Sequence, residues 1–126
     1  MNKILIVDDN LDLSKVLERY FKRNNIICRI VSEGEQIFSA CASFDPDLIL
    51  LDIKMGDLDG RTICKDLKTN NNTNQIPVIM LSALYDIEEK IKDCKADDYI
   101  SKPFDLSEIL IKVKKYLPVK NEYKSK

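Results

Sequence analysis

Three stretches of the chain consist of apolar residues without interruption, and each has the length of a β-strand. They are Ile4–Val7, Leu48–Leu51 and Val78–Leu81. A continuous apolar run indicates a strand that is covered on both faces, which is typical of parallel sheets. Two weaker runs, Ile26–Val31 and Tyr99–Ser101, bring the expected number of strands to five.

The segments around these runs repeat apolar residues at the spacing of a helix. The expected stripes are Leu13, Val16, Leu17, Tyr20 and Phe21; Ile37, Phe38 and Cys41; Ile63, Cys64 and Leu67; Ile87, Ile91 and Cys94; and Ile109, Ile111 to Val113, Tyr116 and Leu117. Two start signals agree with them. Ser32-x-x-Glu35 is a capping box before the second helix, and Asp105 is placed to cap the last helix with Glu108 at its third position.

Strands that alternate with helices predict a parallel sheet with helices on both faces, joined by right-handed crossovers. We therefore predict an α/β fold, a single flavodoxin-like doubly wound (βα)5 domain with a five-stranded parallel sheet in the order 2-1-3-4-5. The 126 residues suit one domain. We expect it to occupy residues 1–119, with a polar basic tail at 120–126 and a surface loop at Thr69–Gln75.

Composition narrows the kinds of chemistry open to this chain. Its net charge of −1 gives no electrostatic case for direct nucleic-acid binding. The absence of histidine excludes Ser-His and Cys-His nucleophiles, and the four cysteines (28, 41, 64 and 94) show no zinc-binding spacing. We interpret them as small buried residues in a reducing compartment, and expect a cytoplasmic protein with no membrane span or signal peptide.

Polar residues follow the apolar runs at the carboxyl ends of the expected strands: Asp8 and Asp9, then Asp52, Ser82 and Lys102. Taken singly, each is more often a cap, a turn residue or a solvated side chain. Because the carboxyl ends of parallel strands border one crevice, the combination indicates a single site. One pair of carboxylates at roughly 4 Å repels by about 4 kcal/mol, so an all-oxygen site of this kind favours a hard cation such as Mg²⁺.

These residues lie in segments that resemble the CheY-like receiver domain of two-component response regulators, from Lys3 to about Leu117. The matching segments are ILIVDDN (4–10), PDLILLDIKM (46–55), LDG (58–60), IPVIMLSA (76–83) and ADDYISKPF (96–104). A DD pair or a KPF alone would be weak evidence for the family, but the five segments together are highly specific. The resemblance implies a signalling phosphoprotein rather than an enzyme, one that catalyses only its own phosphotransfer and autodephosphorylation.

The resemblance also implies a role for each site residue. Asp52 is expected to be the nucleophile and phosphoacceptor, with Ser82 and Lys102 as its catalytic partners. Asp9, Asp52 and the backbone carbonyl of Lys54 are expected to bind Mg²⁺ directly, and Asp8 mainly through water. Ser82 and the aromatic Tyr99 match the switch pair that moves on phosphorylation. The Lys102–Pro103 peptide bond is expected to be cis.

Partners follow from the same resemblance. The phosphoryl donor is expected to be a sensor histidine kinase or a histidine phosphotransfer protein, and phosphorylation is expected to shift the face made by the fourth helix, fifth strand and fifth helix. By analogy with transcriptional regulators, this face is a candidate for homodimerisation, and nucleic acid would be bound only through a separate output domain. Two residues depart from the family pattern: Gly56 stands where proline is common, and Lys95 where glycine is usual.

Two other functions stay open at this point. One is a magnesium-dependent phosphohydrolase with an aspartyl-phosphate intermediate, although its usual D-x-D pattern is absent because Asp8 and Asp9 are adjacent. The other is a receiver-like interaction module that is not phosphorylated, against which stands the retention of Asp9, Asp52, Ser82 and Lys102.

Overall fold

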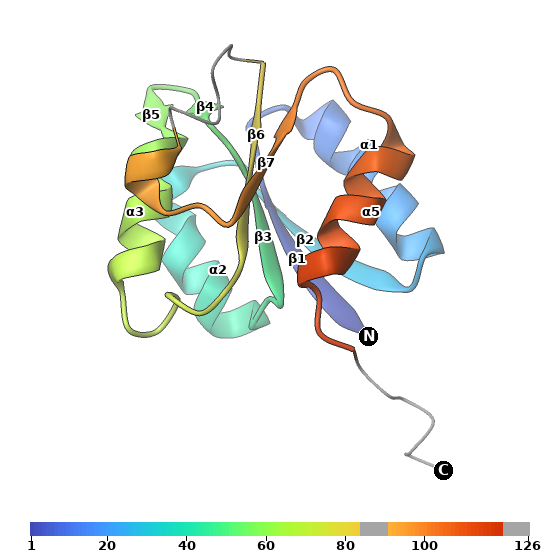
Figure 1. Ribbon diagram of the computed structural model, residues 1–126, viewed down its shortest axis with the longest axis horizontal. Helices are drawn as coiled ribbons and strands as arrows, with labels where there is room; N and C mark the ends of the chain where they lie inside the picture. Colours follow the sequence, from blue (N-terminus) through green and yellow to red (C-terminus); the bar gives the residue numbers. More distant parts are fainter. Residues whose placement is uncertain (84–90, 120–126) are drawn as a thin grey trace.

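The computed structural model describes residues 1–83 and 91–119, which form a parallel five-stranded sheet between two layers of helices (Figure 1). The strand order is β2-β1-β3-β6-β7. The strands span β1 Asn2–Val7, β2 Ile26–Val31, β3 Leu48–Asp52, β6 Val78–Ser82 and β7 Asp98–Ser101. With β6 and β7 counted as the fourth and fifth strands, the order is the predicted one.

Helices α1 and α5 cover one face of the sheet, and α2 and α3 cover the other (Figure 1). The described helices are α1 Leu11–Arg23, α2 Ile37–Phe44, α3 Gly60–Thr69 and α5 Leu106–Tyr116, with short 3-10 helices η1 Gly34–Gln36 and η2 Lys92–Cys94. The expected fourth helix rested on Ile87, Ile91 and Cys94, of which Ile87 lies outside the described residues, as does the expected tail at 120–126. Ile91 and Cys94 are buried, and Cys94 ends the 3-10 helix η2.

The two faces of the sheet bury two separate apolar layers, as the uninterrupted strand runs predict. Leu5, Leu51 and Met80 pack toward α2 and α3, whereas the adjacent Ile6 and Leu50 pack toward α1 and α5. All five are completely buried. This alternation follows from the twofold side-chain period of a strand. None of the described helices has the length and apolarity that crossing a membrane would require.

Several local predictions were wrong. Val16, Phe38 and Ile111 were assigned to buried stripes, but they are exposed. The Ser32-x-x-Glu35 box does not cap α2: the chain first makes η1, and Gln36 is the N-cap, with no side-chain hydrogen bond to the helix. A short antiparallel pair, β4 Lys54–Met55 and β5 Leu58–Asp59, had not been predicted.

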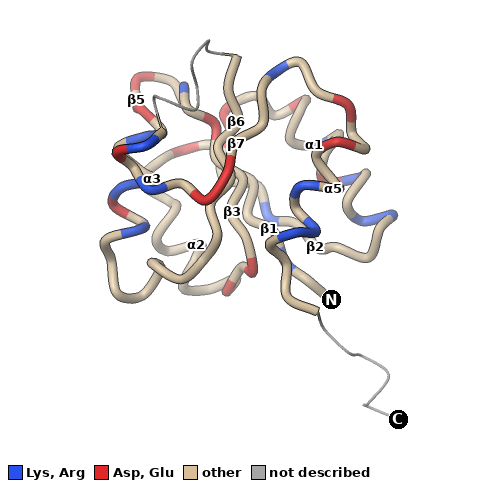
Figure 2. Tube along the Cα trace, viewed as in Figure 1, with Lys and Arg blue, Asp and Glu red and all other residues tan. Residues whose placement is uncertain are grey.

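The last helix begins where it was expected to begin. Asp105 is its N-cap residue and Glu108 lies in its first turn, but the Asp105 side chain makes no capping hydrogen bond within the described residues. Its backbone carbonyl instead accepts from the N–H groups of Glu108 and Ile109. Basic positions mark the end of α5 (Figure 2), where Lys114 and Lys115 are exposed in its last turn.

Candidate functional site

Three carboxylates meet at the carboxyl ends of β1 and β3. Asp8 and Asp9 directly follow β1, and Asp52 is the last residue of β3, the strand that pairs with β1. One oxygen from each carboxylate lies within 4.8 Å of the others. Asp8 is fully buried and Asp52 is 7% exposed, whereas Asp9 is exposed. The parallel register therefore brings together acids that are more than forty positions apart in sequence, as predicted.

Backbone groups orient the first two acids. The N–H of Asn10 donates to Asp8 Oδ1 at 2.9 Å, and the Asn10 side chain in turn caps α1 by accepting from Leu13. The N–H of Gly56 donates to Asp9 Oδ2 at 2.9 Å. Asp8 Oδ2 is buried without a hydrogen-bond partner among the described residues, so this oxygen remains available to a cation or to water.

Lys102 places a positive charge beside two of the three carboxylates. Its Nζ lies 3.6 Å from Asp8 Oδ2 and 3.6 Å from Asp52 Oδ1. Lys102 follows β7, and its backbone N–H donates to the carbonyl oxygen of Ser82 at 2.8 Å, which ties it to the end of β6. The Lys102–Pro103 peptide bond is cis.

The pKa of Asp52 reports how far the positive charge of the site offsets its negative charge. Burial, and next the neighbouring Asp8 carboxylate, raise this pKa to about 6, although Lys102 and the backbone N–H of Lys54 act in the opposite direction. One lysine therefore does not compensate the acids that surround Asp52. A carboxylate in such surroundings gains stability from any added positive charge.

The other predicted site residues lie around this cluster at different distances from it. Ser82 ends β6 beside β3 and is 3% exposed. Lys54 has an exposed side chain. Tyr99 lies two residues before the carboxyl end of β7 and is half-buried, with Lys112 Nζ 5.2 Å from the centre of its ring. The structure thus brings Asp8, Asp9, Asp52 and Lys102 into one group and places Tyr99 outside it.

Gly60 supports the site and was not assigned a role from the sequence. It begins α3, and its N–H donates to the carbonyl of Ile53. A β-carbon at this position would collide with the backbone of Asp52 and Ile53, so only glycine lets α3 approach the end of β3. The LDG segment at 58–60 contains this glycine, but the close approach of α3 to the end of β3 depends on tertiary structure.

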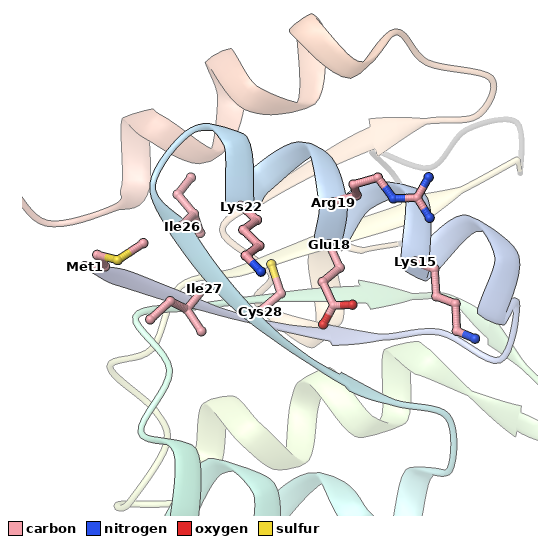
Figure 3. Close-up of a pocket in the computed structure, with 8 residues that line it drawn as sticks. All are labelled: Met1, Lys15, Glu18, Arg19, Lys22, Ile26, Ile27 and Cys28. Atoms are coloured by element: carbon pink, nitrogen blue, oxygen red, sulfur yellow. The ribbon is translucent and has the colours of Figure 1, made fainter.

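A large hollow beside α1 lies away from the acidic cluster. It is a groove of about 680 Å³ between α1 and β2 (Figure 3). Its lining includes the cationic side chains of Lys15, Arg19 and Lys22 and the apolar Ile27. None of the predicted site residues lines this groove, so the volume of a groove does not indicate where the predicted site lies.

Comparison with known proteins agrees with this geometry. A model of the response regulator receiver domain family matches residues 4–114. The chain is 36% identical over 119 residues to the DNA-binding dual master transcriptional regulator RpaA of Synechocystis sp., a match that covers 93% of this chain and 49% of that protein. The chain thus spans about half the length of that curated relative.

Two solved structures extend the comparison to the fold. A two-component response regulator from Clostridium difficile superposes with a TM-score of 0.83 at 27% identity, covering 92% of this chain and 95% of that one. The receiver domain of the sensor histidine kinase PA1611 from Pseudomonas aeruginosa PAO1 gives 0.81 at 26% identity, covering 91% and 96%; its structure has a magnesium ion coordinated in the active site cleft.

Proposed function

The chain belongs to the response regulator receiver domain family, and from this premise we propose that it is a phosphorylation-dependent switch whose phosphoacceptor is Asp52. The observation that carries the proposal is the meeting of three carboxylates within 4.8 Å with one lysine, 3.6 Å from two of them. A phosphoryl group adds negative charge at such a site, so its transfer requires more positive charge than Lys102 alone provides.

Mg²⁺ is the cation that the donor set fits best. All the candidate ligands are oxygens: the carboxylates of Asp9 and Asp52 and the carbonyl of Lys54, with Asp8 held through water. Asp8 Oδ2 accepts no hydrogen bond from the described residues and the pKa of Asp52 is raised, and both observations favour an added cation. When bound, Mg²⁺ would offset the charge of the acids and of the phosphoryl oxygens.

The residues of this chain would share the transfer in the following way. A carboxylate oxygen of Asp52 attacks phosphorus and displaces the donor's leaving group, which gives an acyl phosphate on Asp52. Lys102 holds a phosphoryl oxygen through its ammonium group. Ser82, buried at the neighbouring strand end, turns its hydroxyl toward the same group, and Tyr99 changes rotamer with it. The site lies at the carboxyl ends of the strands, so a phosphoryl donor can reach it while this domain stays folded.

The proposal also covers the source of the phosphoryl group and the surface through which phosphorylation would act. These 126 residues contain no histidine, so a phosphohistidine donor lies outside this sequence, in a sensor kinase or a phosphotransfer protein. The output face would include β7 and α5 together with the expected fourth helix. We also propose a cytoplasmic location and dimerisation through this face. DNA binding, as in the transcriptional relative, would need an output domain separate from residues 1–119.

The proposal is tested by incubating the chain with acetyl phosphate and Mg²⁺. We expect the intact mass to increase by one phosphoryl group, and we expect EDTA to prevent the increase. Asp52→Asn should abolish it. Asp45→Asn is the matched control, because Asp45 precedes β3 at the opposite end of the strand and adopts a left-handed conformation that asparagine tolerates.

Three outcomes would contradict the proposal. Equal labelling of Asp52→Asn and the parent would remove Asp52 as the acceptor. A folded parent that takes no phosphoryl group would instead support an interaction module. Multiple turnover of small phosphate monoesters would support a phosphohydrolase.

A further inference from the structure

Two cysteines that are 30 positions apart in sequence lie against each other. Cys64 is on α3 and Cys94 ends η2. The Cys64 thiol donates to the carbonyl oxygen of Cys94 at 3.3 Å, and the Cys94 thiol donates to the carbonyl oxygen of Ile91 at 3.1 Å. Cys64 is fully buried and Cys94 is 3% exposed, and both are free thiols in the structure. Such proximity is what an intramolecular disulfide requires of its partners.

We propose that Cys64 and Cys94 form an oxidation site, a dithiol that a hydroperoxide converts into an intramolecular disulfide. This site is separate from the carboxylate cluster, and its chemistry does not depend on phosphorylation of Asp52.

A small oxidant can approach Cys94 from the surface. A pocket of about 260 Å³ reaches it, lined by Asp59, Arg61, Thr62, Lys65, Asp93 and Cys94. Arg61 is held there by Asp59, whose carboxylate it contacts at 2.7 Å. Hydrogen peroxide is close to water in size, so a pocket of this volume admits it.

The surroundings give the two thiols different roles. Of the two cysteines only Cys94 lines this pocket, whereas Cys64 is fully buried. The adjacent Cys64 thiol lowers the pKa of Cys94, and the charge of Arg61 acts in the same direction, against the effect of burial. The adjacent Cys94 thiol and burial raise the pKa of Cys64. Because the thiolate is the reactive form, Cys94 is the residue that meets the oxidant and Cys64 the one that resolves the product.

The reaction balances in two steps. The Cys94 thiolate attacks one peroxide oxygen, the O–O bond breaks, and hydroxide leaves; with a proton from solvent this gives water and a sulfenic acid on Cys94. Cys64 sulfur then attacks the Cys94 sulfur, the S–O bond breaks, and the departing hydroxide takes the Cys64 proton as a second water. Two thiols lose two electrons, and one hydroperoxide is reduced.

The decisive experiment uses the full chain with Cys28→Ser and Cys41→Ala, which leaves only the proposed pair. After hydrogen peroxide, we expect the intact mass to fall by two hydrogens and both thiols to resist alkylation in urea, and we expect dithiothreitol to reverse both changes. The disulfide should also raise the urea midpoint of unfolding, because it closes a loop in the unfolded chain. Peptide mapping of the unsubstituted chain tests for the same Cys64–Cys94 disulfide in the parent protein.

The matched control is Cys64→Ala with Cys94→Ala, which retains Cys28 and Cys41. These two pack into apolar layers on opposite faces of the sheet, so we expect no intramolecular bond in the folded state. Cys64→Ala alone should stop at a sulfenic acid on Cys94 that dimedone traps. The proposal is overturned if the folded pair stays reduced at peroxide concentrations that oxidise free thiols, or if the bond forms only after unfolding in urea.

Discussion

Asp52 has a charge that its surroundings compensate only in part. Its pKa of about 6 lies above the ordinary value of an aspartate, so the folded protein binds this proton more tightly than the unfolded chain does. The ionised form therefore costs stability. This cost is absent below the ordinary pKa of about 4, grows as the pH rises toward 6, and is complete above it.

Asp52→Asn removes this cost because asparagine has no charge. In EDTA at neutral pH, we expect the variant to be more stable than the parent by about 1–3 kcal/mol, with the difference shrinking toward zero as the pH falls to about 4. Urea unfolding monitored by circular dichroism across this range measures it. Asp45→Asn, exposed and at the other end of β3, should follow the parent at every pH. A variant as stable as the parent at neutral pH would mean that Lys102 compensates Asp52 fully.

The backbone of Lys95 is strained, and this strain also costs stability. It adopts a left-handed conformation, with φ of 62°, which favours glycine over residues that carry a side chain. A side chain there costs up to about 1 kcal/mol, so Lys95→Gly should stabilise the fold by that order. Lys115→Gly is the matched control, because the same substitution inside α5 should destabilise by about 1 kcal/mol. Chemical denaturation gives both values, and a loss of stability in Lys95→Gly would show that flexibility of the unfolded chain outweighs the strain.

At the scale of elements, β3 and α3 form the support on which Asp52 is held. Gly60 starts α3 directly against the backbone of Asp52 and Ile53, whose atoms are fixed by the sheet. In Gly60→Ala the added methyl group has to displace one of the two elements. We expect a loss of about 1–3 kcal/mol in the free energy of unfolding and slower labelling of Asp52 by acetyl phosphate.

Gly34→Ala is the control for this prediction. Its methyl group would contact the end of the Leu58 side chain, which is 47% exposed and can rotate away. We expect a change within about 0.5 kcal/mol and unchanged labelling. If both alanine variants behaved alike, the approach of α3 to β3 would not be what holds Asp52 in place.

The elements that could be predicted from the sequence are those with a strong local signal. The buried strands are continuous apolar runs, so β3 and β6 were predicted to within one residue and β1 to within two. The position of the strand-end acids followed from the parallel arrangement. The β4–β5 pair has only two residues in each strand, too few to show a period. Likewise Cys64 and Cys94 carry no sign of their proximity, because it arises from the packing of η2 on α3.

At the scale of the whole molecule, the site joins distant parts of the chain. Its residues come from the ends of β1 and β3 and from the segment after β7, so a ligand bound there is lost when the sheet unfolds. A ligand that binds only the folded state adds RT ln(1 + [L]/Kd) to stability, about 2.7 kcal/mol at a hundredfold excess over Kd. Binding of Mg²⁺ should therefore be measurable as global stability.

We expect saturating Mg²⁺ to raise the free energy of unfolding of the parent by about 1–3 kcal/mol, and EDTA to reverse the gain. The gain should be largest above pH 6, because below it protons compete with the cation for Asp52. Asp9→Asn should lose most of the effect while remaining folded, since Asp9 is exposed and its substitution leaves both apolar layers intact. Sodium chloride at equal ionic strength separates specific binding from screening. If Mg²⁺ stabilised Asp9→Asn as much as the parent, the ion would be acting elsewhere on the surface, and the carboxylate cluster would not be the magnesium site.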